Sequence, residues 1–424
     1  MELKKYNANH TQVLKINQIV RTISETHKFD KDKLIAINTS DVENGVMGNG
    51  TLTFVDELKG QFKKTIVKDD ILFSEIRPAN RRFAKVTTKN TKDYVVSTKL
   101  MVLRKYNEDV DLEYFYYCLT NQPFLDILQR RAENRIGSFP QITFDLLSEY
   151  AFPIPPISEQ KRISSVISTL DKKIALNRQI NQNLEAMAKQ LYDYWFVQFD
   201  FPNENGRPYK SFGGKMVWNE KQRKYIPEYW EVKSLSNWLE IKSGFPFKSE
   251  TYKPIGRYKI ITIKNVQDGE LVTSGCDYVN DIPSRAKDYI SLQIGDRLIS
   301  LTGNCGRLCV VCEENLLLNQ RVGLLCCDAI YLEYFYNFLN SGTMRTVIDN
   351  LANGAAQANL SPVELCKTDC FIPPIDILLS YNRKVNAIRK AIVQNNQEIS
   401  QLAKQRDELL PLLMNGQVSV NSDL

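Results

Sequence analysis

Arginine and amide side chains gather on a few short polar stretches of this sequence. Residues 76–83 read Ile-Arg-Pro-Ala-Asn-Arg-Arg-Phe and lie between two predicted strands. Arginine can donate two hydrogen bonds to guanine, asparagine and glutamine can pair with adenine, and any cation can bind phosphate. Such a loop could therefore contact nucleic acid, although each of these residues taken singly is more often a solvated surface side chain.

Similar polar stretches recur later in the chain. Residues 302–307 place an asparagine and an arginine on a glycine-rich loop, and residues 354–359 occupy the place that residues 137–141 hold earlier. Because the set occurs twice, we expect it to contact DNA. The candidate DNA-binding residues are Arg77, Asn80, Arg81, Arg82, Arg130, Arg131, Arg135, Gln141, Lys248, Asn304, Arg307, Gln357 and Asn359.

Three cysteines carry the other chemical signal. Cys305, Cys309 and Cys312 have the C-x3-C-x2-C spacing of the iron–sulfur ligands in radical S-adenosylmethionine enzymes. Two valines between the last two cysteines place them in an apolar run, and the matching stretch 83–87 has no cysteine. Buried structural thiols are therefore the favoured interpretation. A cluster-bearing enzyme is the alternative, and a colourless purified sample would exclude it.

Other catalytic motifs are missing from the sequence. It has no phosphate-binding G-x-x-x-x-G-K-[ST] loop, and its only histidines are His10 and His27. We therefore expect no enzymatic activity, no metal and no cofactor. The net charge of +6 is compatible with nucleic acid. Nine cysteines, no signal peptide and no membrane-length apolar run predict a cytoplasmic protein with reduced thiols.

Two long helices are predicted to position these loops. Proline pairs precede two long stretches, 158–197 and 375–410, and Ser158 is the expected N-cap of the first. Apolar residues recur at alternating steps of three and four, which is typical of a coiled-coil seam. The predicted seam residues are Ile163, Ile167, Leu170, Ile174, Asn177, Leu184, Leu191, Val385, Ile388, Ile392, Asn395, Ile399, Leu402 and Leu409.

The two seams are related by a constant offset of 218 residues, and the preceding segments also repeat. Leu-Glu-Tyr-Phe-Tyr occurs at 112–116 and again at 332–336. The predicted strands of the first copy are 34–37, 51–55, 71–73, 83–87 and 95–103, followed by helices at 112–119 and 124–131. The chain thus divides into globular segments 1–154 and 226–372, long helices 155–200 and 373–416, a connector 201–225 and a tail 417–424.

These elements predict an α+β fold with two similar globular domains separated by two long helices. The helices would pair as an antiparallel coiled coil, giving a pseudo-twofold internal repeat. Their shared seam would span roughly 40 Å, which is on the scale of about twelve base pairs of duplex DNA. The alternative is a non-catalytic scaffold whose two domains bind protein rather than DNA.

At this point the residues resemble a known family, the DNA specificity (S) subunits of type I restriction–modification systems. The resemblance covers essentially the whole chain. It is carried by Pro-Pro-Ile-Ser-Glu-Gln-Lys-Arg-Ile at 155–163, Leu-Asp-Lys-Lys-Ile at 170–174, Trp-Phe-Val at 195–197, Ile-Pro-x-x-Trp-Glu-Val at 226–232, and Arg-Asp-Glu-Leu-Leu-Pro at 406–411.

The resemblance implies that each globular segment is a target recognition domain reading one half of a bipartite double-stranded DNA site. The helices would set the gap between the halves. The chain would recruit two methylation subunits, which use S-adenosylmethionine to methylate adenine, and restriction subunits in the full complex. It would itself have no catalytic residue and no contact with a membrane.

Overall fold

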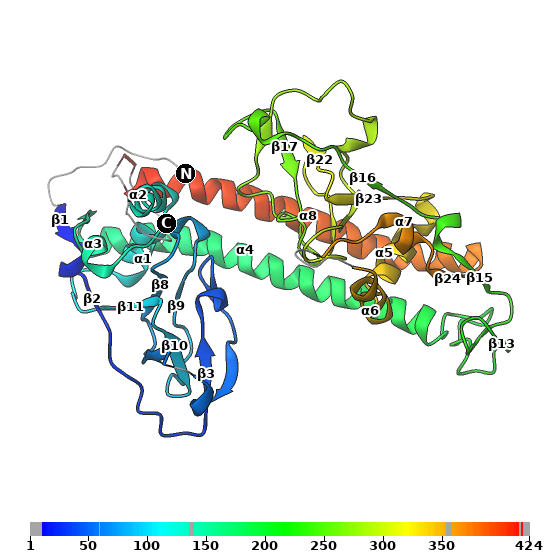
Figure 1. The fold of residues 1–424 in the computed structure, drawn as a ribbon, viewed down its shortest axis with the longest axis horizontal. Helices are drawn as coiled ribbons and strands as arrows, with labels where there is room; N and C mark the ends of the chain where they lie inside the picture. Colours follow the sequence, from blue (N-terminus) through cyan, green and yellow to red (C-terminus); the bar gives the residue numbers. More distant parts are fainter. Residues whose placement is uncertain (1–10, 59, 135–139, 353–357, 415–416, 419–424) are drawn as a thin grey trace. The chain divides into compact units, whose positions relative to one another are not determined.

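A computed structural model describes residues 11–58, 60–134, 140–352, 358–414 and 417–418 of the chain (Figure 1). The contacts divide the chain into two units. Unit 1 comprises residues 1–173 and 402–424, and unit 2 comprises residues 174–401. The division falls inside both long helices, α4 (Ile157–Tyr192) and α8 (Ile375–Met414), so each unit contains part of each helix. The domain boundaries given above remain a prediction.

Unit 1 is built from two four-stranded sheets and three shorter helices. The sheets have the strand orders β6-β3-β10-β7 and β2-β11-β8-β9. The strands are β1 (Gln12–Lys15), β2 (Val20–Thr22), β3 (Lys33–Ile37), β4 (Val42–Glu43), β5 (Val46–Met47), β6 (Thr51–Phe54), β7 (Phe62–Lys64), β8 (Ile71–Ser74), β9 (Phe83–Lys85), β10 (Tyr94–Ser97), β11 (Leu100–Lys105) and β12 (Ala151–Ile154). The helices are α1 (Leu112–Thr120), α2 (Gln122–Glu133) and α3 (Phe144–Ser148).

Alternating apolar residues on β8 and β11 explain the layers of unit 1. Ile71 and Phe73 face a core that also contains residues of α1, α4 and α8, whereas Leu72 and Val102 face a second core shared with β3 and β10. Side chains of a strand point alternately to its two faces. The sheet that contains β8 and β11 is therefore buried on both faces. The loops between its strands lie at its edges.

Unit 2 repeats this arrangement with the strand orders β18-β17-β22-β19 and β16-β23-β20-β21. The strands are β13 (Met216–Asn219), β14 (Lys224–Pro227), β15 (Glu231–Ser234), β16 (Glu240–Ser243), β17 (Tyr258–Ile261), β18 (Tyr278–Val279), β19 (Ser291–Leu292), β20 (Arg297–Ser300), β21 (Leu308–Val310), β22 (Leu316–Leu318), β23 (Val322–Cys326) and β24 (Asp369–Ile372). The helices are α5 (Ala329–Leu339), α6 (Gly342–Leu351) and α7 (Pro362–Cys366).

The two units pair their strands in the same way. β3 and β10 are parallel in unit 1, as are β17 and β22 in unit 2. In both units the remaining pairs of the four-stranded sheets are antiparallel. The sequence repeat therefore corresponds to a repeated strand topology.

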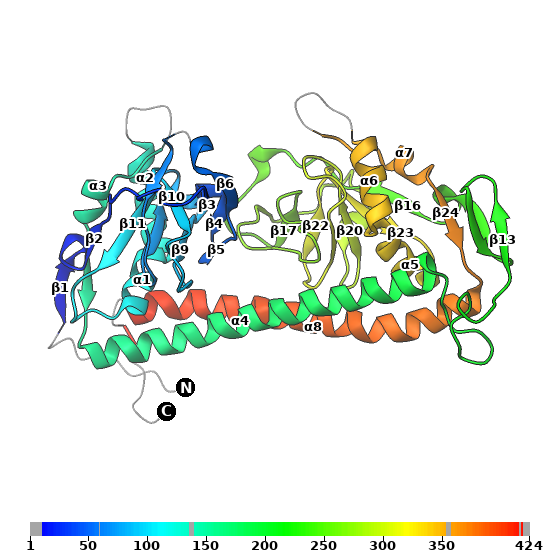
Figure 2. The same ribbon diagram turned by 90° about the horizontal axis from the view of Figure 1, so that it is seen from below.

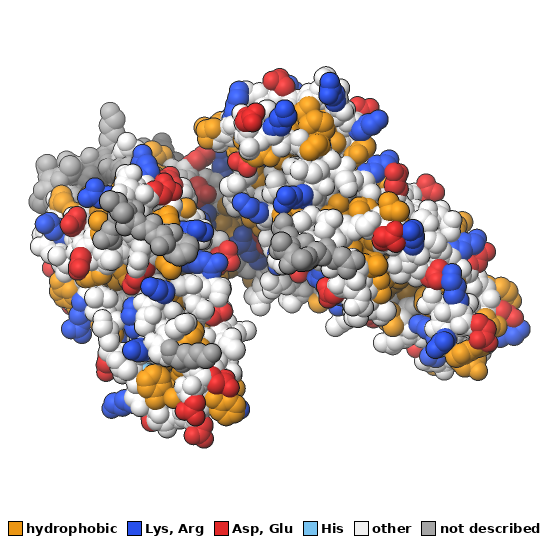
Figure 3. All heavy atoms as spheres, viewed as in Figure 1, with side chains coloured by type: hydrophobic (Ala, Val, Ile, Leu, Met, Phe, Trp, Pro, Cys, Tyr) orange, Lys and Arg blue, Asp and Glu red, His pale blue; other side chains and the backbone are white. Residues whose placement is uncertain are grey.

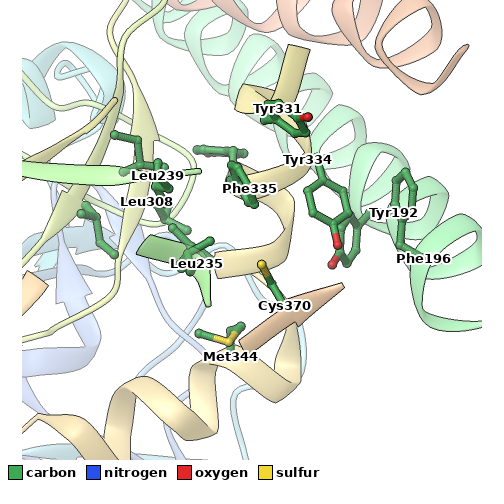
Figure 4. Close-up of a cluster of buried hydrophobic side chains, with 14 of the residues drawn as sticks. Tyr192, Phe196, Leu235, Leu239, Leu308, Tyr331, Tyr334, Phe335, Met344 and Cys370 are labelled. Carbon is green, nitrogen blue, oxygen red and sulfur yellow. The ribbon is translucent and has the colours of Figure 1, made fainter. Parts of the chain in front are cut away.

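In unit 2, aromatic side chains pack the end of the long helix α4 against the shorter helix α5. The end of α4 lies beside α5 (Figure 2). Tyr192, at that end, and Phe196, in the π-helical turn η5 (Asp193–Val197), lie beside Tyr334 of α5 (Figure 4). The ring centroids are 5.7 Å and 4.9 Å from that of Tyr334. Trp195 and Trp230 belong to the same buried cluster. Offset and edge-to-face rings at these separations add stability beyond the area that they bury.

Within each unit, the segments of α4 and α8 run antiparallel. In unit 2, Asn177 donates a hydrogen bond to Glu398 (2.8 Å) and Asn181 donates one to Asn396 (2.7 Å), so residue numbers rise on one helix and fall on the other. In unit 1, Arg406 of α8 pairs with Asp171 of α4 at 2.9 Å. None of the predicted seam residues is fully exposed.

Two local predictions are wrong. The predicted strand 95–103 is two strands, β10 and β11, separated by a turn at Thr98 and Lys99. Helix α4 already includes Ile157, so Ser158 lies within its first turn rather than at its N-cap. Helix α8 continues through Pro411, within the predicted helical range 373–416. The connector 201–225 stays a prediction, and it contains β13 and the start of its hairpin partner β14.

The mixed composition of helix and sheet is confirmed. The described helices include none that is both long and apolar enough to cross a membrane. The long helices fail this criterion because charged and amide side chains occupy much of their length.

Candidate nucleic-acid interface

The arginine-rich loop of unit 1 joins β8 to β9 and contains a short helical turn, η4 (Pro78–Asn80). Arg77 and Arg81, which flank this turn, both have left-handed backbone conformations, with φ of 48° and 53°. That conformation is uncommon for side chains larger than glycine. Hydrogen bonds from the loop to neighbouring segments hold it there.

Two of the predicted arginines brace the loop from inside. Arg81 donates from Nε to Asn44 Oδ1 (2.8 Å) and from Nη1 to Gln122 Oε1 (2.6 Å), and burial lowers the pKa of its guanidinium. Arg82 donates to the carbonyl oxygen of Thr39 at 2.6 Å. Both side chains are half-buried, so they position the loop more directly than they offer donors to a ligand.

The other predicted residues near the loop are exposed. Arg77 and Asn80 lie on the loop itself, and Arg130 and Arg131 lie in the last turn of α2. The Ala79 amide donates to Gln129 of α2 at 3.0 Å, which ties the loop to that helix. These exposed side chains therefore lie on or beside a loop whose backbone is held in place.

Gln141 lies beside the start of the same loop. The Arg77 amide donates to the Pro140 carbonyl (3.0 Å), and the Ile142 amide donates to the Glu75 carbonyl (2.7 Å). The Gln141 side chain donates to the Glu75 carboxylate at 2.9 Å. The structure thus brings together the β8–β9 loop and the segment that follows α2, although they are far apart in the sequence.

Unit 2 has the corresponding contact. The Gly303 amide donates to the Ala358 carbonyl (2.8 Å), and the Leu360 amide donates to the Leu301 carbonyl (2.8 Å). Thr302 donates from its hydroxyl to the Asn359 side-chain oxygen at 3.2 Å. Asn359 therefore holds the position in unit 2 that Gln141 holds in unit 1.

The rest of the unit 2 loop divides between exposed and braced residues. Asn304 is exposed, whereas Arg307 is half-buried and donates to the Gln267 side chain. Gly306 has φ +78°, and a Cβ there would lie 2.7 Å from Ile348 Cγ2 of α6. The loop packs so closely on α6 that only glycine fits at this position.

Three predicted residues stand apart from these stretches. Arg135 and Gln357 lie outside the described residues. Lys248 is exposed immediately before the short helical turn η7 (Ser249–Thr251), and no described hydrogen bond or ion pair joins its side chain to the loop of unit 2.

Sequence reasoning missed a turn that completes each site. In unit 1 it is the β10–β11 turn with Lys99, and in unit 2 it is the β22–β23 turn with Gln320 and Arg321. A hollow of about 570 Å³ in unit 2 is lined by Arg321 and Asn359, with Ser243, Leu301, Thr302, Gln320, Leu360, Ser361 and Pro362. Aligning the repeats across residues 97–99 and 319–321 would have revealed the turn.

Two of the three spaced cysteines lie in different buried clusters. Cys305 belongs to the core that contains α5, whereas Cys309 belongs to the core between the two sheets. Burial raises the pKa of the Cys309 thiol, and it raises that of Cys312 to about 12. Across the described residues, no three His, Cys, Asp or Glu side chains are grouped to hold a metal ion.

On the face of the molecule shown in Figure 3, charge alone does not locate an interface. On the face shown in Figure 3, Lys and Arg side chains are interspersed with Asp and Glu. Between the two long helices, the asparagines of the seam do not pair with each other at equivalent positions. Asn395 donates a hydrogen bond to Asn181 at 2.9 Å, whereas Asn177 donates to Glu398. Hydrogen-bonding geometry, rather than a single-sign patch, distinguishes the loop regions.

Comparison with known proteins finds a family model that is similar to the N-terminal part of the chain. Residues 10–186 match the model of the type I restriction modification DNA specificity domain. This part of the chain is similar to a type I restriction modification DNA specificity domain. The resemblance drawn from the sequence is thereby confirmed. The specificity domain includes all of the described unit 1 loops and most of α4.

Relatives extend the similarity beyond the specificity domain. The HindI type I restriction enzyme specificity subunit of Haemophilus influenzae is 29% identical, with 95% of this chain and 98% of that protein covered. The MjaIX specificity subunit of Methanocaldococcus jannaschii is 26% identical over 73% of this chain and 69% of its own length. The crystal structure of a type I S subunit from M. genitalium has a similar fold, with a TM-score of 0.50, 16% identity, and coverage of 97% and 98%.

Proposed function

We propose that this chain is the DNA-specificity subunit of a type I restriction–modification complex. The observation that carries the proposal is the repeated site: in each unit a polar loop is hydrogen-bonded to a segment that presents an amide side chain, Gln141 or Asn359. Amide side chains and arginines are the groups that read base edges in the major groove. Two such sites suit a bipartite DNA sequence.

In this proposal each globular segment is a target recognition domain for one half-site. The exposed residues Arg77 and Asn80 would contact one half, and Asn304 and Asn359 the other. Arg81, Arg82 and Arg307 would hold the loops in shape. The chain would be non-catalytic, and methylation subunits docked on the long helices would supply the chemistry, with restriction subunits joining in the full complex.

The test is a map of adenine methylation in the source strain, by long-read sequencing, with the gene intact and deleted. We expect a two-part motif with a fixed gap that disappears on deletion. Asn80→Ala should relax the motif in one half, and Asn359→Ala should relax it in the other. Arg285→Ala, an exposed change outside both loops, should leave the motif unchanged. Loss of both halves in a single-site variant would contradict the assignment of one half-site to each segment.

We also propose that α4 and α8 pair along their predicted seam as one antiparallel coiled coil and set the gap between the half-sites. Inserting one helical turn into both helices should lengthen the gap and leave both half-sites unchanged. A gap of unchanged length would refute this role of the helices. A chain whose DNA binding was independent of salt and sequence would instead favour a scaffold that binds protein.

A further inference from the structure

Lys99 occupies a fixed position at the edge of the unit 1 site. Its carbonyl accepts a hydrogen bond from the Glu75 amide (3.1 Å), at the first residue of the arginine-rich loop. Its own amide donates to the Ser97 hydroxyl at 3.3 Å. The backbone of the turn is therefore tied both to the strand before it and to the loop beside it.

Arg321 has the same two ties in unit 2. Its carbonyl accepts from the Leu301 amide (3.0 Å), at the first residue of the corresponding loop. Its amide donates to the Asn319 side-chain oxygen at 3.3 Å. Lys99 and Arg321 thus occupy equivalent positions in the two units, because their backbones form the same pair of hydrogen bonds and their turns join equivalent strands.

Both side chains are exposed, and neither forms an ion pair with a described acidic residue. Among the described residues, neither Lys99 nor Arg321 forms a side-chain hydrogen bond or an ion pair, whereas other basic residues of the sheets do, such as Arg104 with Asp70 and Lys259 with Glu313. Lys99 also repels the half-buried Lys64, whose pKa is lowered mainly by burial. An uncompensated cation on a rigid turn suits an anionic ligand.

The neighbours of the two cations differ between the units while the charge stays the same. Glu75 stands where unit 2 has Leu301, and Thr98 stands where unit 2 has Gln320. Groups that read different base sequences should differ, whereas every base pair presents the same phosphates. We propose that Lys99 and Arg321 each bind a phosphate of the DNA backbone, one at each half-site. This inference rests on the proposed function.

These contacts would fix the register of the duplex on each site. Arg321 and Asn359 line the same hollow, so a strand held at this cation would pass the amide proposed to read bases. Phosphate contacts position a protein on DNA, and base contacts then specify the sequence. Lys99 would do the same beside Gln141 in unit 1.

The test measures binding of the full chain to a fluorescein-labelled duplex of random sequence, by anisotropy, over a range of salt concentrations. We expect Lys99→Ala and Arg321→Ala each to weaken binding about fivefold. Each should reduce the slope of log affinity against log salt by about 1. The charge-retaining variants Lys99→Arg and Arg321→Lys should keep both values. Lys89→Ala, an exposed lysine beyond the far end of β9, is the matched control and should change neither.

Methylation mapping of the same variants separates phosphate binding from base reading. The motif should keep its sequence in both halves. A base position that relaxes in Arg321→Ala or Lys99→Ala would overturn the phosphate assignment, as would an unchanged salt slope in both alanine variants. If binding by the unmodified chain does not depend on salt, the proposed DNA role itself fails. Salt-dependent binding that the variants leave unaltered refutes only the role of the turns.

Discussion

The two units share the pentapeptide Leu-Glu-Tyr-Phe-Tyr, but its glutamate pairs with a long helix only in unit 2. In unit 2, Glu333 of α5 is buried between Arg389 of α8 and Arg297 of β20, and Arg389 also pairs with Glu185 of α4. In unit 1, the equivalent Glu113 pairs with Lys85 of β9, and 41% of its side chain is exposed.

Unit 1 contacts its helix segments through a tyrosine instead. The Tyr117 hydroxyl donates to Asp171 of α4 at 2.8 Å, and Asp171 also accepts from Arg406 of α8 at 2.9 Å. Asp171 and Arg406 are 36% and 25% exposed, whereas the side chains of Glu333 and Arg389 are at most 5% exposed. Identical residues thus have different energetic roles, because burial rather than residue type sets the strength of an ion pair.

The largest expected effect follows from removing the buried carboxylate. Glu333→Gln would leave the buried Arg297 guanidinium without its counter-charge and Arg389 with Glu185 as its remaining partner, and we expect a loss of about 3–5 kcal/mol in the free energy of unfolding. Glu113→Gln, the equivalent change in unit 1, should cost less than about 1 kcal/mol. Urea unfolding of the full chain measures both, and hydrogen exchange at 329–339 and 112–120 assigns the loss to a unit. Equal losses would contradict the distinction.

The next prediction concerns acid. Burial alone would raise the pKa of Glu333, but Arg389 and Arg297 outweigh it and hold that pKa below its usual value. A carboxyl group whose pKa is depressed in the folded state stabilises the fold above its unfolded pKa, about 4.3 for glutamate. That stability is lost as the pH falls through the folded pKa.

Unit 2 should therefore lose hydrogen-exchange protection around α5 on acidification below about pH 4.3. Glu333→Gln should reduce this pH dependence, because the titrating group is gone. Glu113→Gln is the matched control and should leave the acid response of α5 unchanged. A response of α5 that is equally steep in the Glu333 variant would show that another group is responsible.

A smaller effect is expected from the exposed contact of unit 1. Asp171→Asn removes the charge that Arg406 and the Tyr117 hydroxyl share, and we expect a loss of about 1–2 kcal/mol. Tyr117→Phe, which removes only one hydrogen bond, should cost about 1 kcal/mol or less. Thermal unfolding monitored with hydrogen exchange of α1 provides the measurement. A loss as large as that of Glu333→Gln would mean that exposure does not weaken this contact.

The smallest effects should come from the braces of the two loops. Arg82→Ala and Arg307→Ala each remove one side-chain contact from a half-buried arginine, with an expected loss of about 1 kcal/mol. Because each loop is braced within its own unit, each variant should relax only one half of the methylation motif. Relaxation of both halves by either variant would show that these residues support folding more widely.

Much of the fold could be predicted from sequence patterns. The predicted strand 34–37 and helix 112–119 correspond to β3 and α1, because alternation and helical periodicity are local signals. The turn at Thr98 and Lys99 could not be found in this way, since Val-Val-Ser-Thr-Lys-Leu-Met-Val contains no glycine, proline, asparagine or aspartate.

The site was predictable only as a set of stretches. Repetition identified both loops and the amides Gln141 and Asn359, but it could not distinguish exposed Arg77 from braced Arg81, because that depends on the partners Asn44 and Gln122. The burial of Glu333 could not be predicted from the sequence either. Its identical counterpart Glu113 is partly exposed, so no local pattern separates them.

The aromatic cluster of unit 2 makes the molecule optically asymmetric. All four tryptophans of the chain, at positions 195, 218, 230 and 238, lie in unit 2, and two of them are buried with Tyr192 and Phe196. Tryptophan fluorescence excited at the red edge of indole absorption therefore comes from unit 2 alone. A variant with its four native tryptophans replaced and a single tryptophan introduced into unit 1 would report on that unit instead.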